Sequence, residues 1–301
     1  MHILVSVIIT TYKREPDLVI RAIKSVCVQT YSNLEIIIVD DSPADYPYRK
    51  DVEEQIKKCK NEYSIDIRYI AHERNRGACA ARNTGLEAAR GEYVAFLDDD
   101  DEWIPEKIDK QMNVMMEEDV ALVYCGCICK NDTTGEMIKR KMEYHKGYIF
   151  DLLIYNNFIK STSFPLIKKT CLQSIGGFDV EMQSAQDYDV WLRLSEKYQI
   201  SYVAEPLVIY HIHDGERITA NPIKRINGLE RLNDKYKKYI EAHPEVWYER
   251  NIKLTTMYAC VGEKTKALHI WAKCFYMCPQ KIIESIKYLY YIIRSKTEEK
   301  I

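Results

Sequence analysis

The sequence predicts an α/β protein with a doubly wound, mostly parallel sheet and a helical extension at its C-terminal end. Apolar, β-rich runs and helical patterns alternate over roughly the first 125 residues. These runs lack the polar alternation of a strand with one solvated face, so the strands are expected to be buried on both faces. Strands joined by helices in this order imply right-handed crossovers.

The individual elements follow in chain order. Strands are predicted at 3–10, 35–40, 66–71, 93–97 and 121–125, and helices at 16–29, 47–60 and 77–89. The helix at 16–29 begins at a proline and has apolar residues at 18, 19, 22, 23 and 26, which lie on one helical face. The pattern is less regular between about 140 and 215 and becomes helical from about 222, with breaks at Pro244, Gly262 and Pro279.

Composition excludes several classes of protein. The 301 residues are 47% apolar and 29% charged with a net charge of −2, so the chain as a whole has no electrostatic reason to bind nucleic acid. The 10 cysteines form no C-x-x-C pair, which favours reduced core thiols over a zinc site. No secretory signal and no apolar run of about 20 residues is visible, so we expect a cytoplasmic protein.

Polar residues follow three of the predicted strands and should meet at one edge of the sheet. They are 11–14, 40–42 and 98–101. In open α/β sheets, ligands bind beyond the carboxyl ends of the strands. The edge that collects these residues is therefore the predicted binding site.

The acidic run of Asp98, Asp99, Asp100 and Asp101 is the strongest of these signals. Four adjacent carboxylates repel one another unless a cation or solvent lies among them. Their hard oxygens suit Mg²⁺ or Mn²⁺, which bind through one or two carboxylates plus substrate phosphates. The alternative is a solvated acidic turn. An EF-hand is excluded because Trp103 occupies the position that needs glycine.

The turns after the first two strands indicate a nucleotide but not NAD. Asp41 can bond a ribose or a base edge, Tyr12 can stack on a base, and the cation of Arg14 can approach phosphate. The first turn has no glycine, whereas dinucleotide folds carry G-x-G-x-x-G there. Alternatively, Asp41 and Ser42 only cap a turn.

Two further signals lie on predicted helices. Arg82, close to the basic segment Arg74–Gly77, can approach a diphosphate. Asp187 begins an otherwise apolar and aromatic helix, where the pKa of a carboxyl group can be raised to suit a general base. The alternatives are a solvated basic face for the first and a helix-dipole partner for the second.

In combination these segments resemble the inverting glycosyltransferases of family 2, which have a GT-A fold. The resemblance runs from about residue 4 to 215 and rests on four segments in the family's order and spacing: SVIITTYKRE, IIIVDDSP, RGACAARNTGLEAARGEYVAFLDDDDEW and GGFD…QDYDVWLRL. It implies a catalytic domain over 1–220, with a nucleotide-binding half at 1–125 and an acceptor-binding half at 126–220. Residues 221–301 would be the helical extension.

The resemblance also implies roles for individual residues. Thr10, Tyr12 and Asp41 would hold the base and ribose, and Arg82 would lie near the donor. Asp98 and Asp100 match the family's D-x-D pair, with Asp100 on a Mn²⁺ or Mg²⁺ ion and Asp98 and Asp99 on ribose or metal-bound water. His213, rather than His211, would be a second metal ligand. Asp187 would be the general base, and Gln186 replaces the family's frequent Glu.

The implied function is transfer of a sugar from a nucleotide-diphosphate sugar, UDP being the family's commonest nucleotide, to a saccharide or lipid-linked saccharide acceptor. Synthesis of a cell-surface polysaccharide or glycolipid is the expected context. A sugar-phosphate nucleotidyltransferase and a non-catalytic sugar-binding subunit are the alternatives.

The segment 279–296 has a continuous apolar helical stripe with lysines and an arginine on its polar side. It can lie on the inner face of the cell membrane, pack on its own domain, or contact a second copy of the chain.

Overall fold

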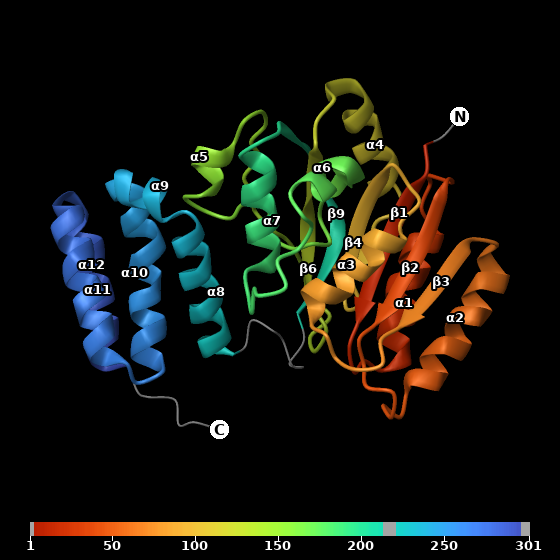
Figure 1. Cartoon of the computed structure of the whole chain (residues 1–301), viewed down its shortest axis with the longest axis horizontal. Helices are drawn as coiled ribbons and strands as arrows, with labels where there is room; N and C mark the ends of the chain where they lie inside the picture. Colours follow the sequence, from red (N-terminus) through yellow and green to blue (C-terminus); the bar gives the residue numbers. More distant parts are fainter. Residues whose placement is uncertain (1–2, 213–220, 296–301) are drawn as a thin grey trace. The chain divides into compact units, whose positions relative to one another are not determined.

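The computed structural model describes residues 3–212 and 221–295 (Figure 1). The chain divides into two compact units. Unit 1 comprises 1–153, 157–180 and 187–214, and unit 2 comprises 154–156, 181–186 and 215–301. Nothing in the sequence pattern indicated that the two short internal segments group with the C-terminal helices.

The first half of the sheet in unit 1 is parallel. Its strands are β1 (Val5–Thr11), β2 (Leu34–Asp40), β3 (Asp66–Ala71) and β4 (Tyr93–Asp98), in the spatial order β3-β2-β1-β4. In this register Ile8 pairs with Ile37 on one side and Phe96 on the other. These three side chains point to one face of the sheet and are buried, and Val7 and Ile9, which point to the other face, are buried as well. These strands are therefore covered on both faces.

Three helices connect these strands: α1 (Pro16–Cys27), α2 (Arg49–Tyr63) and α3 (Ala78–Ala88). Val7 and Ile9 of β1 pack in one cluster with α1 and α2, and Figure 1 shows α2 beside β3. On the other face, a Cβ added at Gly85 of α3 would lie 2.4 Å from Cγ2 of Ile8. Glycine at this position lets α3 approach the strand closely.

The second half of the sheet is mixed. Its elements in chain order are β5 (Glu102–Trp103), α4 (Lys107–Glu118), β6 (Leu122–Asn131), β7 (Met137–Lys139), α5 (Phe150–Leu153), β8 (Leu166–Lys168), α6 (Lys169–Ser174), α7 (Gln186–Ser195) and β9 (Ile200–Ile212). β8 lies antiparallel between β4 and β6, and β6 is parallel to β9. The α/β class is confirmed. The antiparallel strand β8 was missed because three residues are too few to show a period.

The ends of two strands meet around the acidic run. β4 ends at Asp98, and the short strand β5 that follows pairs antiparallel with β9 through Glu102 and Ile209. Residues 99–101 therefore form a tight connection between the parallel and the mixed halves of the sheet. The sheet thus presents the acidic run at the carboxyl end of β4, as the sequence predicts.

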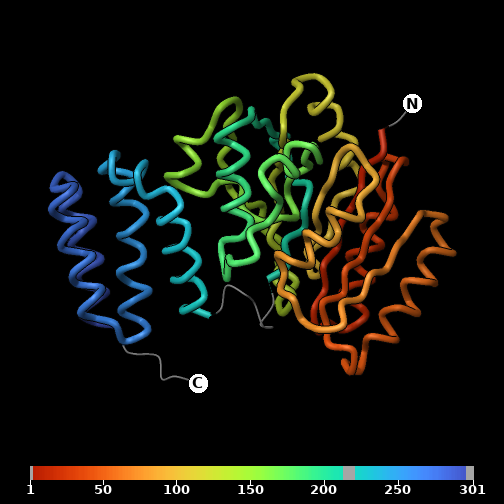
Figure 2. Tube along the Cα trace, in the orientation of Figure 1, coloured from red at the N-terminus to blue at the C-terminus, as the bar shows by residue number. Residues whose placement is uncertain are grey.

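Unit 2 consists of helices, and its chain reverses direction repeatedly (Figure 2). They are α8 (Pro222–Lys235), α9 (Lys237–Ala242), α10 (Pro244–Cys260), α11 (Lys264–Met277), the short 3₁₀ turn η2 (Pro279–Lys281) and α12 (Ile282–Arg294). The predicted breaks at Pro244, Gly262 and Pro279 are confirmed. Leu254, Tyr258, Ala267 and Ile292 share one buried cluster that joins α10, α11 and α12.

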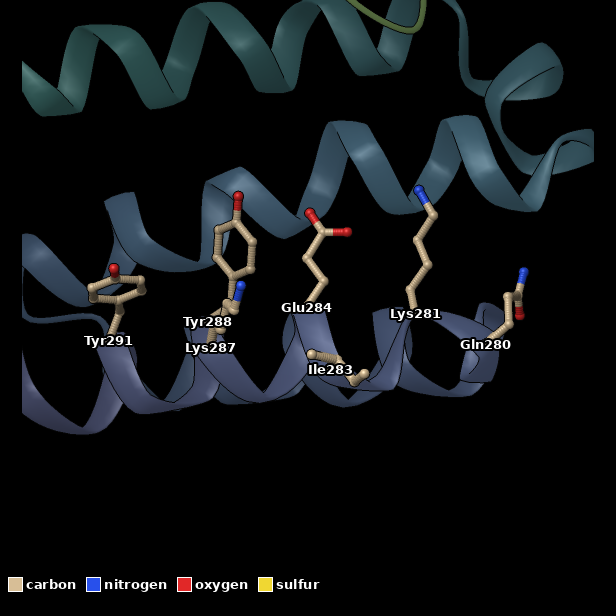
Figure 3. Close-up of a pocket in the computed structure, with 7 residues that line it drawn as sticks. All are labelled: Gln280, Lys281, Ile283, Glu284, Lys287, Tyr288 and Tyr291. Carbon is tan, nitrogen blue, oxygen red and sulfur yellow. The ribbon is translucent and has the colours of Figure 1, made fainter.

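Polar contacts also fasten α12 within unit 2. The hydroxyl groups of Tyr248 and Ser285 are 3.1 Å apart, and the indole N–H of Trp271 donates to the Ser285 carbonyl at 2.7 Å. A groove of about 630 Å³ runs along α12 (Figure 3) and is lined by residues between Gln280 and Tyr291. It contains none of the predicted site residues. Across the part of the chain that the structure describes, no helix is both long and apolar enough to cross a bilayer.

Candidate active site

Asp98 at the end of β4 is held by four neighbours from distant parts of the chain. Its Oδ1 accepts hydrogen bonds from Arg82 Nη2 and Thr162 Oγ1, both at 2.9 Å, and its Oδ2 accepts one from Ser161 Oγ at 3.2 Å. Its backbone N–H donates to Ser163 Oγ at 3.1 Å. About a third of the side chain is still exposed. Asp98 is thus fixed in orientation and still open to a ligand.

The loop Ser161–Ser163 is a part of the site that our sequence analysis missed. The residue before it, Lys160, has a φ of 72°, and its carbonyl accepts a hydrogen bond from the Trp191 indole of α7 at 3.0 Å. The loop is thereby anchored on α7 while its hydroxyl groups reach the acidic run. Three consecutive hydroxyl residues in an irregular segment were the only available signal.

Asp99 and Asp100 share Arg14 as an ion-pair partner. Arg14 Nε lies 3.0 Å from Asp99, and its Nη2 lies 2.9 Å from Asp100. Asp99 is buried, and burial raises the pKa of its carboxyl group to about 7 even though Arg14 opposes the shift. In this arrangement the side chain of Asp99 points into the protein and orients Arg14. Its contact with ribose or metal-bound water stays a prediction.

Asp101 points inward and connects the acidic run to β9. Its carboxylate accepts hydrogen bonds from Ser163 Oγ at 2.7 Å and from the His211 N–H at 3.3 Å. Burial and the adjacent aspartates raise its pKa well above the ordinary range. The His211 ring lies between Glu102 and Asp132 at 2.7 and 2.5 Å. His213, the predicted metal ligand, lies outside the described residues.

Asp187 lies at the start of α7, near Arg82 and Asp98. Burial raises the pKa of its carboxyl group to about 6, opposed by a hydrogen bond from the Tyr188 N–H and by the Arg82 guanidinium. The nearby charge of Asp98 adds to the rise. A carboxylate with this pKa is ionised near neutral pH and still basic enough to accept a proton.

Asp189, two residues further along α7, has a different role. It is fully buried and pairs with Arg193 Nη2 at 2.6 Å. Arg193 also donates to the carbonyls of Ile175 and Gly177. Asp189 therefore clamps α7 to the segment 176–179 and does not face the site, as its helical offset from Asp187 predicts.

The segment 176–179 is also fastened to α3. The amide of Asn83 donates to the Phe178 carbonyl and accepts from the Phe178 N–H, both at 2.8 Å. The Phe178 ring packs edge-on against Phe96, and the Arg82 guanidinium lies 5.5 Å from its centre. These contacts fix the position of Arg82 relative to Asp98 and Asp187.

Asp41 at the end of β2 is buried and surrounded by donors. The N–H groups of Arg76 and Gly77 each donate to it at 2.8 Å, and His72 Nδ1 lies 2.7 Å from its Oδ1. A carboxylate offers about four acceptor sites, so one more bond to a base is compatible with this geometry. Its contact with the base stays a prediction.

The turn after β1 brings the other predicted donor contacts to the same edge. Thr10 pairs in register with Asp98 and Val39. Tyr12 is 42% exposed, and the N–H of the following Lys13 donates to Ser42 Oγ at 2.8 Å. Tyr12 is therefore accessible for stacking on a planar base.

The acidic run fits a cation that is held largely by a substrate. Within residues 3–212 and 221–295, no group of three or more His, Cys, Asp or Glu side chains is arranged to hold a metal ion. Asp98 and Asp100 are the two carboxylates of the run that remain partly exposed. Two carboxylates plus a diphosphate are a donor set typical of Mg²⁺ and Mn²⁺.

Comparison with known proteins decides the family. Residues 6–176 match the family described as "Glycosyl transferase family 2". The chain belongs to glycosyltransferase family 2. This glycosyltransferase is 34% identical over 247 residues to WcaA of Escherichia coli K12, named as a glycosyl transferase of colanic acid biosynthesis, covering 78% of this chain and 81% of WcaA.

A second relative in sequence and one solved structure are also similar to this chain. WfaP of Escherichia coli, named UDP-Glc:alpha-D-GlcNAc-diphosphoundecaprenol beta-1,3-glucosyltransferase, is 32% identical to this family 2 chain, covering 74% of it and 82% of WfaP. A structure of Staphylococcus aureus TarS 1-349, in complex with UDP-GlcNAc, superposes with a TM-score of 0.59 at 18% identity, covering 84% and 81%. The enzyme therefore has the GT-A fold that the motifs indicated.

Proposed function

We propose that this glycosyltransferase moves one sugar from a UDP-sugar to a hydroxyl group of a lipid-linked saccharide, with inversion at the anomeric carbon. The observation that carries the proposal is the convergence of Asp98, Arg82 and Asp187, with the pKa of Asp187 raised to about 6. The names of WcaA and WfaP support a polysaccharide or glycolipid context. Family membership argues against a nucleotidyltransferase.

The chain's own residues supply binding and proton transfer. Asp187 accepts the proton of the acceptor hydroxyl as its oxygen forms a bond to the anomeric carbon. The bond from that carbon to the diphosphate oxygen breaks, and its electron pair leaves with UDP. This single displacement inverts the configuration, and Arg82 would stabilise the negative charge that builds up on the leaving group.

We include a divalent cation in the proposal, held by Asp100 and Asp98 together with the diphosphate. When bound, it would neutralise negative charge on the departing diphosphate. Arg14 holds Asp99 and Asp100 in place before binding, since it pairs with both. On binding, the same guanidinium would contact a phosphate of the donor.

The test of the proposal is Asp187→Asn. Asn keeps the shape of the side chain but cannot take a proton, so transfer should fall by about 10²–10⁴-fold, while UDP affinity measured by calorimetry with Mn²⁺ stays unchanged. Asp119→Asn is the matched control, because Asp119 is exposed at the end of α4. Transfer near the wild-type rate in Asp187→Asn would overturn the assignment of the base.

A further inference from the structure

The terminal helix α12 exposes an apolar face that the core of unit 2 does not use. Ile282, Ile283, Ile286 and Ile293 are 45%, 74%, 54% and 65% exposed, and Tyr290 is 51% exposed. At 3.6 residues per turn, these five side chains fall within an arc of about 100°. We call this set the outer face of α12.

The opposite side of α12 already packs on its own unit. Ile292 and Ser285 are buried there, with Ser285 bonded to Tyr248 and Trp271. Lys281 pairs with Glu249 of α10 at 2.5 Å. Figure 3 shows Lys281, Glu284 and Tyr288 pointing from α12 toward the neighbouring helix, whereas Ile283 does not follow them. The packing of α12 within unit 2 therefore does not bury the outer face.

Positive charge borders the outer face. Lys287 and Arg294 are exposed. Lys287 lies about one helical turn after Ile283, and Arg294 about one turn after Tyr290. The Arg294 guanidinium lies 4.7 Å from the centre of the Tyr290 ring. Glu284, the described acidic residue of α12, lines the groove and points toward the neighbouring helix, whereas Ile283 and Lys287 line the groove at its border with the outer face. An apolar arc flanked by cations and an amphipathic ring complements the surface of an anionic bilayer.

The size of the outer face argues against a second copy of the chain as the occupant. α12 has 13 residues, so the face measures about 20 Å by 10 Å. A stable interface buries about 800 Å² on each partner, several times this area. A bilayer makes no such demand, since a few large apolar side chains can enter the boundary between headgroups and acyl chains.

We propose that the outer face of α12 docks the enzyme on the surface of an anionic lipid bilayer. The isoleucines enter the interface, and Lys287 and Arg294 meet lipid phosphates. The inference goes beyond the proposed transfer reaction and does not depend on the base or the cation. It gives the enzyme a location at which a lipid-linked acceptor would be present.

Flotation of the full chain with vesicles tests the docking. Binding to vesicles of phosphatidylcholine with phosphatidylglycerol should fall at least about tenfold in the double variant Ile283→Asp/Ile286→Asp. Ile138→Asp is the matched control, because Ile138 is 58% exposed on β7 of unit 1, and it should bind as the wild type does. Lys287→Gln and Arg294→Gln should each weaken binding about fivefold at low salt.

Three results would overturn the docking proposal: no flotation of the unchanged chain, equal losses in the control, or a vesicle-free dimer that Ile283→Asp/Ile286→Asp converts to monomer. The last result would make the outer face an interface between copies. Hydrolysis of UDP-sugars without vesicles, measured in parallel, should be unchanged in all these variants. A wild type that floats with vesicles but transfers no sugar to an added saccharide acceptor would contradict the transfer reaction and leave the docking result intact.

Discussion

Asp98, Asp99, Asp100 and Asp101 are neighbours in the chain, yet each meets a different environment. Asp98 accepts from Arg82 and two hydroxyl groups, and Asp100 meets Arg14 at the edge of the site. Asp99 and Asp101 point inward, and burial raises the pKa of both. Two of the four carboxylates are therefore available to a ligand, and the other two position Arg14 and β9.

Variants of Arg14 and Asp100 should have opposite effects: the first on the binding of Mn²⁺ alone, the second on the binding of UDP with Mn²⁺. Arg14→Gln removes the competing cation at Asp100, so Mn²⁺ should bind about three- to tenfold more tightly, a gain of about 1 kcal/mol. Asp100→Asn should weaken Mn²⁺-dependent binding of UDP. Calorimetry measures both. Lys13→Gln controls for loss of a nearby exposed charge, and an equal gain in that variant would contradict the competition.

The stability of Asp187→Asn should depend on pH. Because the pKa of Asp187 is raised from 3.8 to about 6 in the folded state, the native protein binds this proton more tightly than the unfolded chain does. The wild type therefore loses stability as pH rises from about 4 to 6. The variant should be more stable than the wild type above pH 6 by about 3 kcal/mol, and the difference should vanish near pH 4.

Urea unfolding at several pH values checks this dependence. An Asp187→Asn variant that is less stable at every pH would show that the side chain is structural. The same titration predicts that the transfer rate of the wild type falls below about pH 6, where Asp187 becomes protonated.

At the scale of elements, α3, α7 and the segment 176–179 hold one another in place. Asn83 joins α3 to Phe178, and Asp189 with Arg193 joins α7 to Gly177. The glycine is required because its φ is 68° and an added Cβ would lie 2.7 Å from Asn83 Oδ1. Asp187, the proposed base, and Arg82 thus depend on the same supporting contacts.

Asn83→Ala should disturb that support. It leaves the Phe178 N–H and carbonyl without their partner, so it should cost about 1–3 kcal/mol of unfolding free energy. Displacement of Arg82 should also lower transfer, by up to about 10²-fold. Unfolding and kinetic assays measure the two effects. Glu87→Ala, at an exposed site on the same helix, should change neither; comparable losses there would mean that α3 is sensitive everywhere.

At the scale of the whole molecule, the chain forms two units with separate cores. Unit 1 carries Asp98 at the end of β4, Arg82 on α3 and Asp187 on α7, whereas the cluster that includes Ile292 belongs to unit 2. Substitutions in the core of unit 2 should therefore lower the free energy of unfolding without changing the affinity for UDP.

Ile292 and Ile293 provide a matched pair for this separation. Ile292 is 1% exposed and Ile293 is 65% exposed, so Ile292→Ala should lower the unfolding free energy by about 2–5 kcal/mol and Ile293→Ala by little. UDP affinity at low temperature should be the same in both. Equal destabilisation by the two variants would contradict the orientation of α12.

The sequence by itself determined the family, the parallel half of the sheet and the helical breaks of unit 2. These follow from local patterns: continuous apolar runs, prolines and glycines at helix ends, and motif segments in fixed order. The difference in direction between Asp187 and Asp189 is likewise local, because two residues that are two positions apart on a helix point to different sides. The structure agrees with that geometry, while the role of Asp187 as base stays a prediction.

Only the tertiary structure decided which side chains surround the acidic run. Asp98 and Thr162 are 64 residues apart in the chain, and Arg14 and Asp99 are 85 apart. No periodicity relates such distant positions. Because β8 lies beside β4, the preceding loop Ser161–Ser163 reaches Asp98. Burial, which depends on the whole fold, raises the pKa of Asp99 above that of a solvated carboxylate.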